Sequence, residues 1–411
     1  MSELLPNPRI CGGCGESGCS LKCACKLVYY CGRLCQKKDW PSHKKKCTAA
    51  LDKKAKQVKR EHGKDHFDFL EARMTAGQAH FDAGRFESAE RCFLEGRRIC
   101  MEQREICDNI MNNENIAVCC LNLGNTYRIL GRHHEALRMH EESLGLHVEI
   151  YGPRSQETAK ILQCMSANLH AQGKIEQAFV KIDEAHEIFK EVGGTETHAF
   201  AAVLTTKANC YKAMGRLDDA RSMHLESLRI KRMLPGDLSE FISISLFELG
   251  TLCRMQGMLR EARQYYEESL ELDRRVHGER HPKVASAFNN IGIVILEEGQ
   301  HDEALKMFSK ALKIKRLVLG EDHRDVANSV CNIGEVFLRQ GKFDEALEKY
   351  EETIAIYTRA LGVDNIELIK THKNIAKAKF GRGDRAGAFE SLREAQRVQD
   401  KHVSYGVEPS W

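Results

Sequence analysis

The chain has few residues that interrupt helices and no long apolar segment. Of its 411 residues only 7 are proline, and 42% are hydrophobic, which excludes a disordered or proline-rich chain and favours a folded, helical one. No run of about 18 apolar residues occurs, so neither a membrane span nor a membrane partner is expected. Residues 1–9 lack the apolar core of a signal peptide. The sequence therefore predicts an intracellular protein, either cytoplasmic or nuclear.

Sequences that mark common classes of enzyme are also missing. We find neither a phosphate-cradling glycine loop nor a nucleophile elbow. The run His134-Glu135 with His140 imitates a zinc-protease motif, but its histidines are six residues apart. Two zinc-binding histidines on one face of a helix stand four residues apart. The sequence therefore predicts a protein without catalytic activity.

Cysteine and positive charge are both concentrated at the start of the chain. Eight of the 17 cysteines fall in the first 47 residues, and an intracellular location predicts that the cysteines are reduced. Later ones, such as Cys164 and Cys331, lie within helical patterns and are expected to be small buried apolar residues. Residues 1–65 hold 15 Lys and Arg against 6 Asp and Glu, whereas the whole chain has a net charge of +3. This basic head indicates either an anionic partner or a solvated basic helix.

A glycine recurs every 42 residues through most of the chain, and an alanine stands five residues after each one. Gly84 and Ala89 form a further pair that precedes the others by a 47-residue step. The recurring glycines are Gly131, Gly173, Gly215, Gly257, Gly299, Gly341 and Gly383. A fixed period of this length indicates stacked copies of one two-helix unit, and such stacks commonly form binding surfaces.

The unit over residues 284–323 shows the pattern in detail. Ile291 and Ile295 recur at helical spacing, and Gly299 is expected to end that first helix in a left-handed conformation. A second helix follows and is expected to end at Gly320. In all eight units, small residues stand seven positions before and twelve positions after the recurring glycine. Close crossing of the two helices is therefore predicted, because larger side chains would push the backbones apart.

This pattern resembles the tetratricopeptide repeat, as the segment Leu123-Gly124-Asn125-Thr126-Tyr127 with Gly131 and Ala136 illustrates. The long period and linkers such as His277-Gly-Glu-Arg-His-Pro282 resemble the kinesin-light-chain subgroup. The resemblance implies a mainly α, right-handed solenoid of helical hairpins over residues 70–398, in which the first helix of each unit lines a concave groove.

In this family an asparagine on the first helix often holds the backbone of a bound peptide. The amide suits that role because it both donates and accepts hydrogen bonds. The alternative is an exposed or helix-bridging asparagine. Nine residues before the recurring glycine this chain carries Asn122, Asn290, Asn332 and Asn374.

The cysteine-rich head contains four short-spaced pairs of metal-ligand residues. They are Cys11 and Cys14, Cys23 and Cys25, Cys31 and Cys35, and His43 and Cys47. Eight such ligands suffice for two tetrahedral zinc ions and leave no open coordination position, so the ions would be structural. A head of this size cannot bury much core, and metal binding would supply its folding free energy.

Residues 28–47 resemble the MYND-type zinc finger. The family has a cross-brace, in which the first and third pairs would share one zinc ion and the second and fourth pairs the other. Only one residue separates Cys23 from Cys25, where the family usually has two. Either Cys23 binds through a tightened turn or Cys19 replaces it. MYND fingers bind short proline-containing peptides with a glutamine and a tryptophan, which correspond to Gln36 and Trp40; the alternative for Trp40 is a small core beside the zinc.

The sequence thus predicts a zinc-binding adaptor or scaffold that binds extended or proline-containing peptides of protein partners. The expected parts are an N-terminal tail (1–10), the finger (11–47), a basic helical connector (48–69), the repeat array (70–398) and a C-terminal tail (399–411). The alternative is a nuclear regulator of transcription or chromatin whose basic head contacts nucleic acid or a corepressor. The basic residues lack interleaved aromatic side chains, which weakens the case for nucleic acid.

Overall fold

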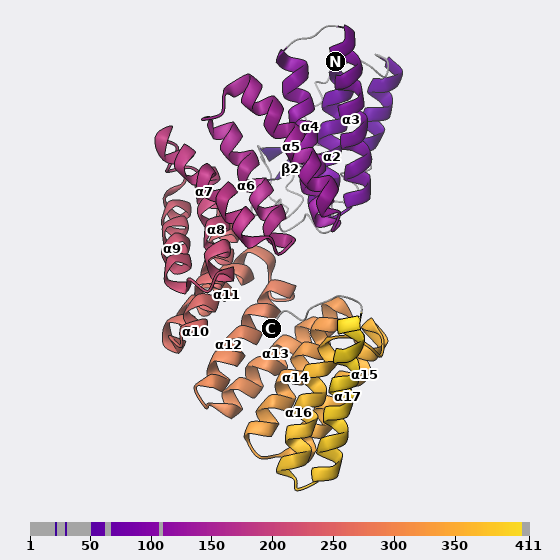
Figure 1. Ribbon diagram of the computed structural model, residues 1–411, viewed down its shortest axis with the longest axis vertical. Helices are drawn as coiled ribbons and strands as arrows, with labels where there is room; N and C mark the ends of the chain where they lie inside the picture. The colour runs from indigo at the N-terminus through magenta and orange to yellow at the C-terminus, as the bar shows by residue number, and fades with distance from the viewer. Residues whose placement is uncertain (1–20, 23–28, 31–50, 62–66, 107–109, 405–411) are drawn as a thin grey trace, which may run out of the picture. The chain divides into compact units, whose positions relative to one another are not determined.

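The computed structural model describes residues 21–22, 29–30, 51–61, 67–106 and 110–404 (Figure 1). The chain divides into two compact units, Met1–Phe241 and Ile242–Trp411. Consecutive helices pair into antiparallel hairpins in both units, so the predicted helical-hairpin solenoid is confirmed.

Among its described residues, the first unit contains two short strands, a helix over residues 51–61 and four hairpins. Strands β1 (Leu21–Lys22) and β2 (Tyr29–Tyr30) pair antiparallel, with Leu21 opposite Tyr30. The helices are α2 (Phe67–Asp82), α3 (Phe86–Ile106), α4 (Ile110–Ile129), α5 (His133–Tyr151), α6 (Gln156–Ala171), α7 (Ile175–Glu191), α8 (His198–Ala213) and α9 (Leu217–Met233).

The second unit begins within the first turn of α10 and also consists of hairpins. Its helices are α10 (Ser239–Met255), α11 (Leu259–His277), α12 (Pro282–Glu297), α13 (His301–Leu319), α14 (Arg324–Arg339), α15 (Phe343–Leu361), α16 (Glu367–Gly381) and α17 (Arg385–Ser404). Even-numbered helices are the first members of each hairpin, and odd-numbered helices are the second.

The recurring glycines act as the sequence predicts. Gly299 follows α12 with a φ of 82°, and Gly320 caps α13 with a φ of 88°. Only glycine adopts this left-handed conformation without strain, so each helix ends where the pattern places it. The linkers also start the next helix, because His281 and His323 accept a hydrogen bond from a backbone N–H in the first turn of α12 and α14.

Close helix crossing is confirmed in the units that carry a glycine seven positions before the recurring glycine. At Gly334 an added Cβ atom would lie 2.8 Å from Cε1 of Tyr350, whose side chain is fully buried. Gly292 meets Phe308 in the same way, also at 2.8 Å. Each hairpin with a glycine at this position therefore packs a ring of its second helix directly on that glycine of its first helix.

We expect Gly334→Ala to lower the melting temperature, because the ring of Tyr350 must move and the core loses about 1–3 kcal/mol. Gly145→Ala is the matched control, since an added Cβ atom at Gly145 meets no atom within 4 Å in the middle of α5. That variant should raise the melting temperature slightly, because alanine favours a helix over glycine by about 1 kcal/mol. Equal shifts of the same sign in the two variants, measured by circular dichroism, would contradict this packing.

A helix over residues 51–61, here called the connector helix, covers the first hairpin. Leu51 and Ala55 are buried, and Ala55 belongs to the same apolar cluster as Phe69 and Leu70 of α2. The lysines Lys53, Lys54 and Lys56 are exposed on the other side. The connector helix therefore extends the apolar core of the repeats by one helix and keeps its basic residues in solvent.

Candidate peptide-binding groove

The first helices of the hairpins in the second unit line a hollow of about 360 Å³. Helices α10, α12, α14 and α16 each contribute side chains to it. Stacked hairpins place equivalent helices side by side, so residues 42 positions apart in the sequence become neighbours on one surface. We call this surface the groove.

The floor of the groove is apolar. Ile293 and Leu296 of α12, Phe308 of α13 and Cys331 of α14 line it. Burial raises the pKa of the Cys331 thiol to about 11, so the thiol is protonated and uncharged at neutral pH. An uncharged, apolar floor suits a hydrophobic side chain of a ligand.

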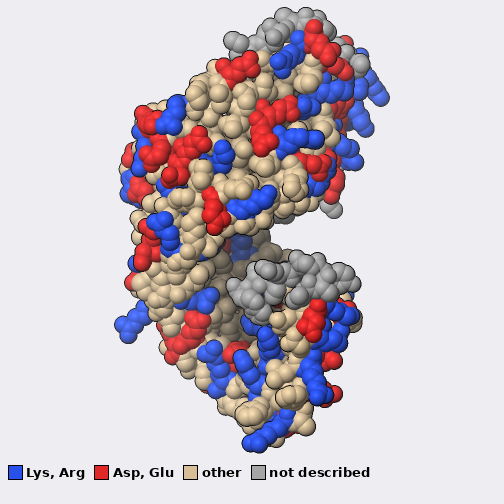
Figure 2. All heavy atoms as spheres, viewed as in Figure 1, with Lys and Arg blue, Asp and Glu red and all other residues tan. Residues whose placement is uncertain are grey.

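The rim of the groove is mainly basic. Arg254, Arg339, Lys370 and Lys377 face two acidic residues, Glu297 and Glu335. Arg254 Nη1 lies 3.0 Å from Glu297 Oε1, and Arg339 Nε lies 3.0 Å from Glu335 Oε1. Both carboxylates are therefore paired with an arginine. On the face shown in Figure 2, Lys and Arg side chains gather over α14 and α16.

Lys370 and Lys377 complete the rim and stand seven residues apart on α16. Two helical turns separate them, so they lie on the same face with Asn374 between them. In the part of the chain that the structure describes, neither ammonium group makes a hydrogen bond or an ion pair. Both lysines are exposed, and their charges remain available to an acidic ligand.

The structure brings two of the four predicted asparagines into the groove. Asn332 lies on its wall, and its Nδ2 donates to Oδ1 of Asn289 at 2.8 Å. Asn374 also lines the groove but is only 4% exposed. Asn290 donates to the backbone oxygen of Ser286 one turn earlier. Asn122 is half-buried on α4 in the other unit.

The remaining predicted site residues lie outside the described residues. They are the eight zinc ligands Cys11, Cys14, Cys23, Cys25, Cys31, Cys35, His43 and Cys47, the alternative ligand Cys19, and the peptide-contacting pair Gln36 and Trp40. The strands β1 and β2 flank Cys23 and Cys25 in the sequence.

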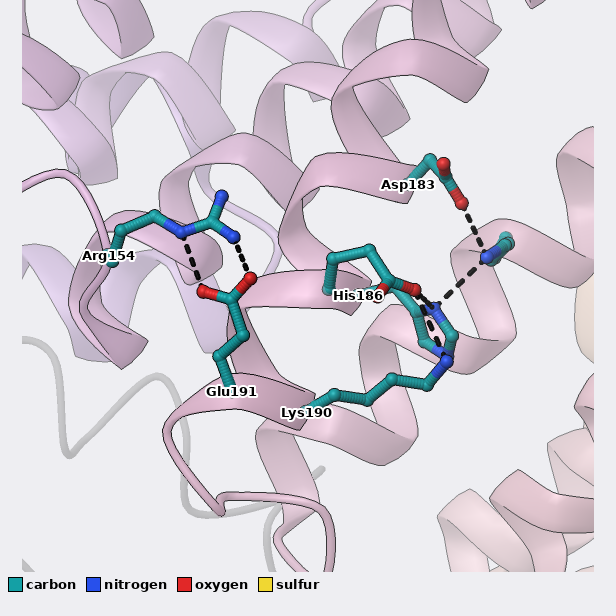
Figure 3. A network of polar contacts seen from close by, with 7 residues as sticks. Arg154, Asp183, His186, Lys190 and Glu191 are labelled. Atoms are coloured by element: carbon teal, nitrogen blue, oxygen red, sulfur yellow. Dashed lines mark hydrogen bonds and ion pairs between the residues drawn. The ribbon is translucent and has the colours of Figure 1, made fainter.

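A second polar cluster lies in the first unit, where α7 meets α8 (Figure 3). Lys207 Nζ donates to Asp183 Oδ1 at 2.6 Å and to His186 Nδ1 at 3.1 Å. Burial, together with the nearby charge of Lys207, lowers the pKa of His186. Lys207 is only 6% exposed. Because its ammonium group already has two partners, this cluster joins the two helices and offers no charge to a ligand.

Comparison with known families agrees with these features. The family model of the tetratricopeptide repeat matches residues 116–191, 160–233, 199–275, 241–316, 283–359 and 326–401. The chain belongs to the tetratricopeptide repeat family. The model of the MYND finger matches residues 11–47, the boundaries that the cysteine pairs predict. These two matches support a protein-interaction adaptor.

Solved structures with the same fold include the apo form of the quorum sensor NprR from B. thuringiensis. It is 13% identical with a TM-score of 0.61, over 89% of this chain and 98% of that one. The repeats are also similar to the STAND protein PH0952 from Pyrococcus horikoshii, at 14% identity and a TM-score of 0.57, over 88% of this chain and 53% of that one. A putative kinesin light chain of Podospora anserina is 20% identical with a TM-score of 0.43, over 50% of this chain and 98% of that one.

Two further observations concern the described residues alone. Their eight cysteines are all free thiols. Among their helices we find none with both the length and the hydrophobicity that a membrane crossing requires.

Proposed function

We propose that this protein is a non-catalytic adaptor whose groove binds an extended, acidic segment of a partner protein. One observation carries the proposal: Lys370 and Lys377 present two charges without a partner among the described residues, on the rim of a groove with an apolar floor. An acidic segment supplies carboxylates for both lysines, and an apolar side chain between them can enter the floor. Charge-assisted hydrogen bonds of this kind are about twice as strong as neutral ones.

The spacing of the lysines indicates the form of the segment. Seven residues of α helix span about 10 Å. In a polyproline II conformation, residues three apart lie on one side of the chain and are separated by about 9 Å. A segment with two acidic residues at positions i and i+3 therefore matches Lys370 and Lys377. Asn332 lies on the neighbouring helix, where its amide can contact the backbone of the segment.

We further propose that the finger holds two structural zinc ions through the eight ligands named above. The match of residues 11–47 to the MYND finger supports this assignment. Gln36 and Trp40 would give the finger a separate contact for proline-containing peptides. The free thiols of the described residues support an intracellular location. We propose no contact between the connector helix and nucleic acid. One side of this helix packs on α2, and its exposed lysines Lys53, Lys54 and Lys56 are explained by the solvent on the other side.

The proposal is tested by selecting peptides that bind the full-length chain from a random 12-residue library. We expect the selected peptides to be enriched in Asp and Glu, with pairs of acidic residues three positions apart. A selection that yields basic or uncharged peptides would contradict the proposal for the groove. Proline-rich peptides would instead bind the finger. Their binding should therefore be unchanged when Lys370 and Lys377 are both replaced by glutamate.

A further inference from the structure

Three ligand-type side chains from three helices meet at the N-terminal end of the repeats. They are Asp52 of the connector helix, His80 of α2 and Cys92 of α3. Their ligand atoms all lie within 4.8 Å of one another, and His80 Nε2 is 3.0 Å from Asp52 Oδ2. His80 and Cys92 are 4% and 2% exposed. Nitrogen, oxygen and sulfur donors therefore converge at one largely buried point.

The repeat pattern shows that His80 is not required for packing the hairpin. It stands four residues before Gly84, and most later units carry an apolar residue at that position. The equivalent residues are Tyr127, Leu169, Tyr211, Cys253, Ile295, Phe337 and Lys379. Among these eight positions, histidine occurs only in the unit against which the connector helix packs. Histidine is therefore found at this position in the one unit where the Asp52 carboxylate of the connector helix lies next to it.

Cys92 also differs from an ordinary core cysteine. Its neighbours Ala89 and Phe93 belong to the apolar cluster of the first hairpins, whereas Cys92 does not. Its Sγ instead lies within 4.8 Å of the ligand atoms of Asp52 and His80. The sulfur therefore faces the polar cluster rather than the apolar core.

The groups around the cluster hold the carboxylate in place. Arg73 Nη1 lies 3.7 Å from Asp52 Oδ1, which is the oxygen that does not contact His80. The guanidinium is itself paired with Glu95, whose Oε2 lies 2.7 Å from Arg73 Nε. Glu95 thus offsets the positive charge of Arg73 next to the cluster. Outer contacts that orient a ligating carboxylate are typical of metal sites.

We propose that Asp52, His80 and Cys92 bind one zinc ion, separate from those of the finger. Two zinc ligands with bonds of about 2.0 Å in tetrahedral geometry lie about 3.3 Å apart, close to the distance between His80 and Asp52. When zinc binds, the Cys92 thiol releases its proton to solvent, and the resulting thiolate and the Asp52 carboxylate together neutralise Zn²⁺, so the occupied site carries no net charge. The fourth position remains for water. The ion would join the connector helix to the first hairpin and stabilise their contact.

The alternative is a simple hydrogen bond between His80 and Asp52 that joins the two helices, with Cys92 as a bystander. The two accounts differ in what they require of the sulfur. A hydrogen bond needs only His80 and Asp52, whereas a zinc site needs Cys92 as well. Replacing Cys92 therefore separates them.

The test is the zinc content of the purified full-length chain, measured by elemental analysis after dialysis against metal-free buffer. The variant Cys31→Ser/Cys35→Ser/His43→Ala/Cys47→Ser removes two ligands from each of the two finger ions, and we expect it to retain one equivalent of zinc. Adding Cys92→Ala or His80→Gln should remove that equivalent, and adding Cys120→Ala, a buried cysteine of α4, should not. Retention of the same zinc content after adding Cys92→Ala would overturn the proposal.

A second measurement guards against loss of zinc through misfolding. Cobalt is added to the zinc-free Cys31→Ser/Cys35→Ser/His43→Ala/Cys47→Ser protein, and the near-ultraviolet band of thiolate-to-cobalt charge transfer is recorded. We expect this band in that background and not after adding Cys92→Ala, with the helical circular dichroism of the two proteins equal. A band of the same strength with Cys92→Ala, or none in either protein, would contradict the site.

Discussion

Replacing Lys370 and Lys377 together by glutamate should weaken binding of a selected acidic peptide at least about 100-fold. Each lysine is expected to make one charge-assisted hydrogen bond, worth about 1.5–3 kcal/mol, and the glutamates add repulsion. A total loss of about 3 kcal/mol corresponds to a factor of roughly 100 in Kd. The affinity is measured with the full-length chain by fluorescence anisotropy of a labelled peptide.

The matched control reverses two lysines with the same spacing on the second helix of a hairpin. Lys306 and Lys313 stand seven residues apart on α13 and are exposed. Lys306→Glu/Lys313→Glu changes the net charge by the same amount but alters no residue of the groove. We expect it to weaken binding only a few-fold, and less at higher salt, because long-range attraction is screened. Equal losses in the two double variants would show that net charge, rather than the groove, governs binding.

Replacing His140 by phenylalanine should stabilise the protein, most strongly at acidic pH. His140 is fully buried, and neither ring nitrogen has a hydrogen-bond partner within the described residues. Equivalent positions hold Phe93 and Phe308, and His140 faces Gly124 as Phe308 faces Gly292. Unsatisfied buried polar atoms cost about 1–3 kcal/mol, so a gain of this size is expected at pH 7. Denaturant unfolding followed by circular dichroism measures it.

The pH dependence follows from the same burial. Burial, together with the charge of Arg128, lowers the pKa of His140 from 6.5 to about 4. Between these values the unfolded chain binds a proton that the folded chain excludes, so stability falls as the pH drops below 6.5. By pH 4 this effect approaches 3 kcal/mol, since one pKa unit is worth 1.36 kcal/mol. The advantage of His140→Phe should therefore grow between pH 7 and pH 4.5. A constant advantage would contradict the neutral, buried imidazole.

His224 offers an independent check of the same effect. It is also fully buried without hydrogen-bond partners for its ring nitrogens in the described structure, and burial lowers its pKa to about 3. Its unit has Ala208 in place of the packing glycine, which leaves less room. Leucine is therefore the better replacement, as in the last unit, where Ala376 and Leu392 occupy these two positions. The advantage of His224→Leu should grow with acidity in the same way.

The hairpins could be predicted from the sequence because their main determinants are local. Gly299 and Gly320 end helices through their own backbone conformation, and Gly334 is small because Tyr350 packs on it within the same hairpin. Such relationships recur at a fixed spacing and are visible without a structure.

The groove was only partly predictable, because its properties depend on neighbouring units. Position alone suggested Asn290 and Asn332 equally, yet only Asn332 lines the hollow. The repeat pattern does not single out Lys370 and Lys377, although their spacing places both on the same face of α16 as Asn374. Whether a charge is paired depends on residues about 42 positions away, as Arg254 with Glu297 shows. Such pairs between neighbouring units form only in the folded chain.

Two other features were missed for related reasons. In the sequence His140 stands out only through its likeness to a protease motif, yet it occupies the position where other units carry a buried aromatic residue. The connector was expected to be helical and basic, but its packing on α2 through Ala55 was not expected. In both cases the role of the residue depends on its neighbours on another helix, which are Gly124 for His140 and Phe69 and Leu70 for Ala55.

The most direct test of the central claim is to locate the bound peptide. A selected acidic peptide that carries a photoreactive leucine analogue between its acidic residues is cross-linked to the full-length chain, and the modified residues are identified by mass spectrometry. The account predicts cross-links to the groove floor, at Ile293, Leu296 or Cys331, and their loss in Lys370→Glu/Lys377→Glu. Cross-links confined to the second helices, or to residues 1–61, would contradict it.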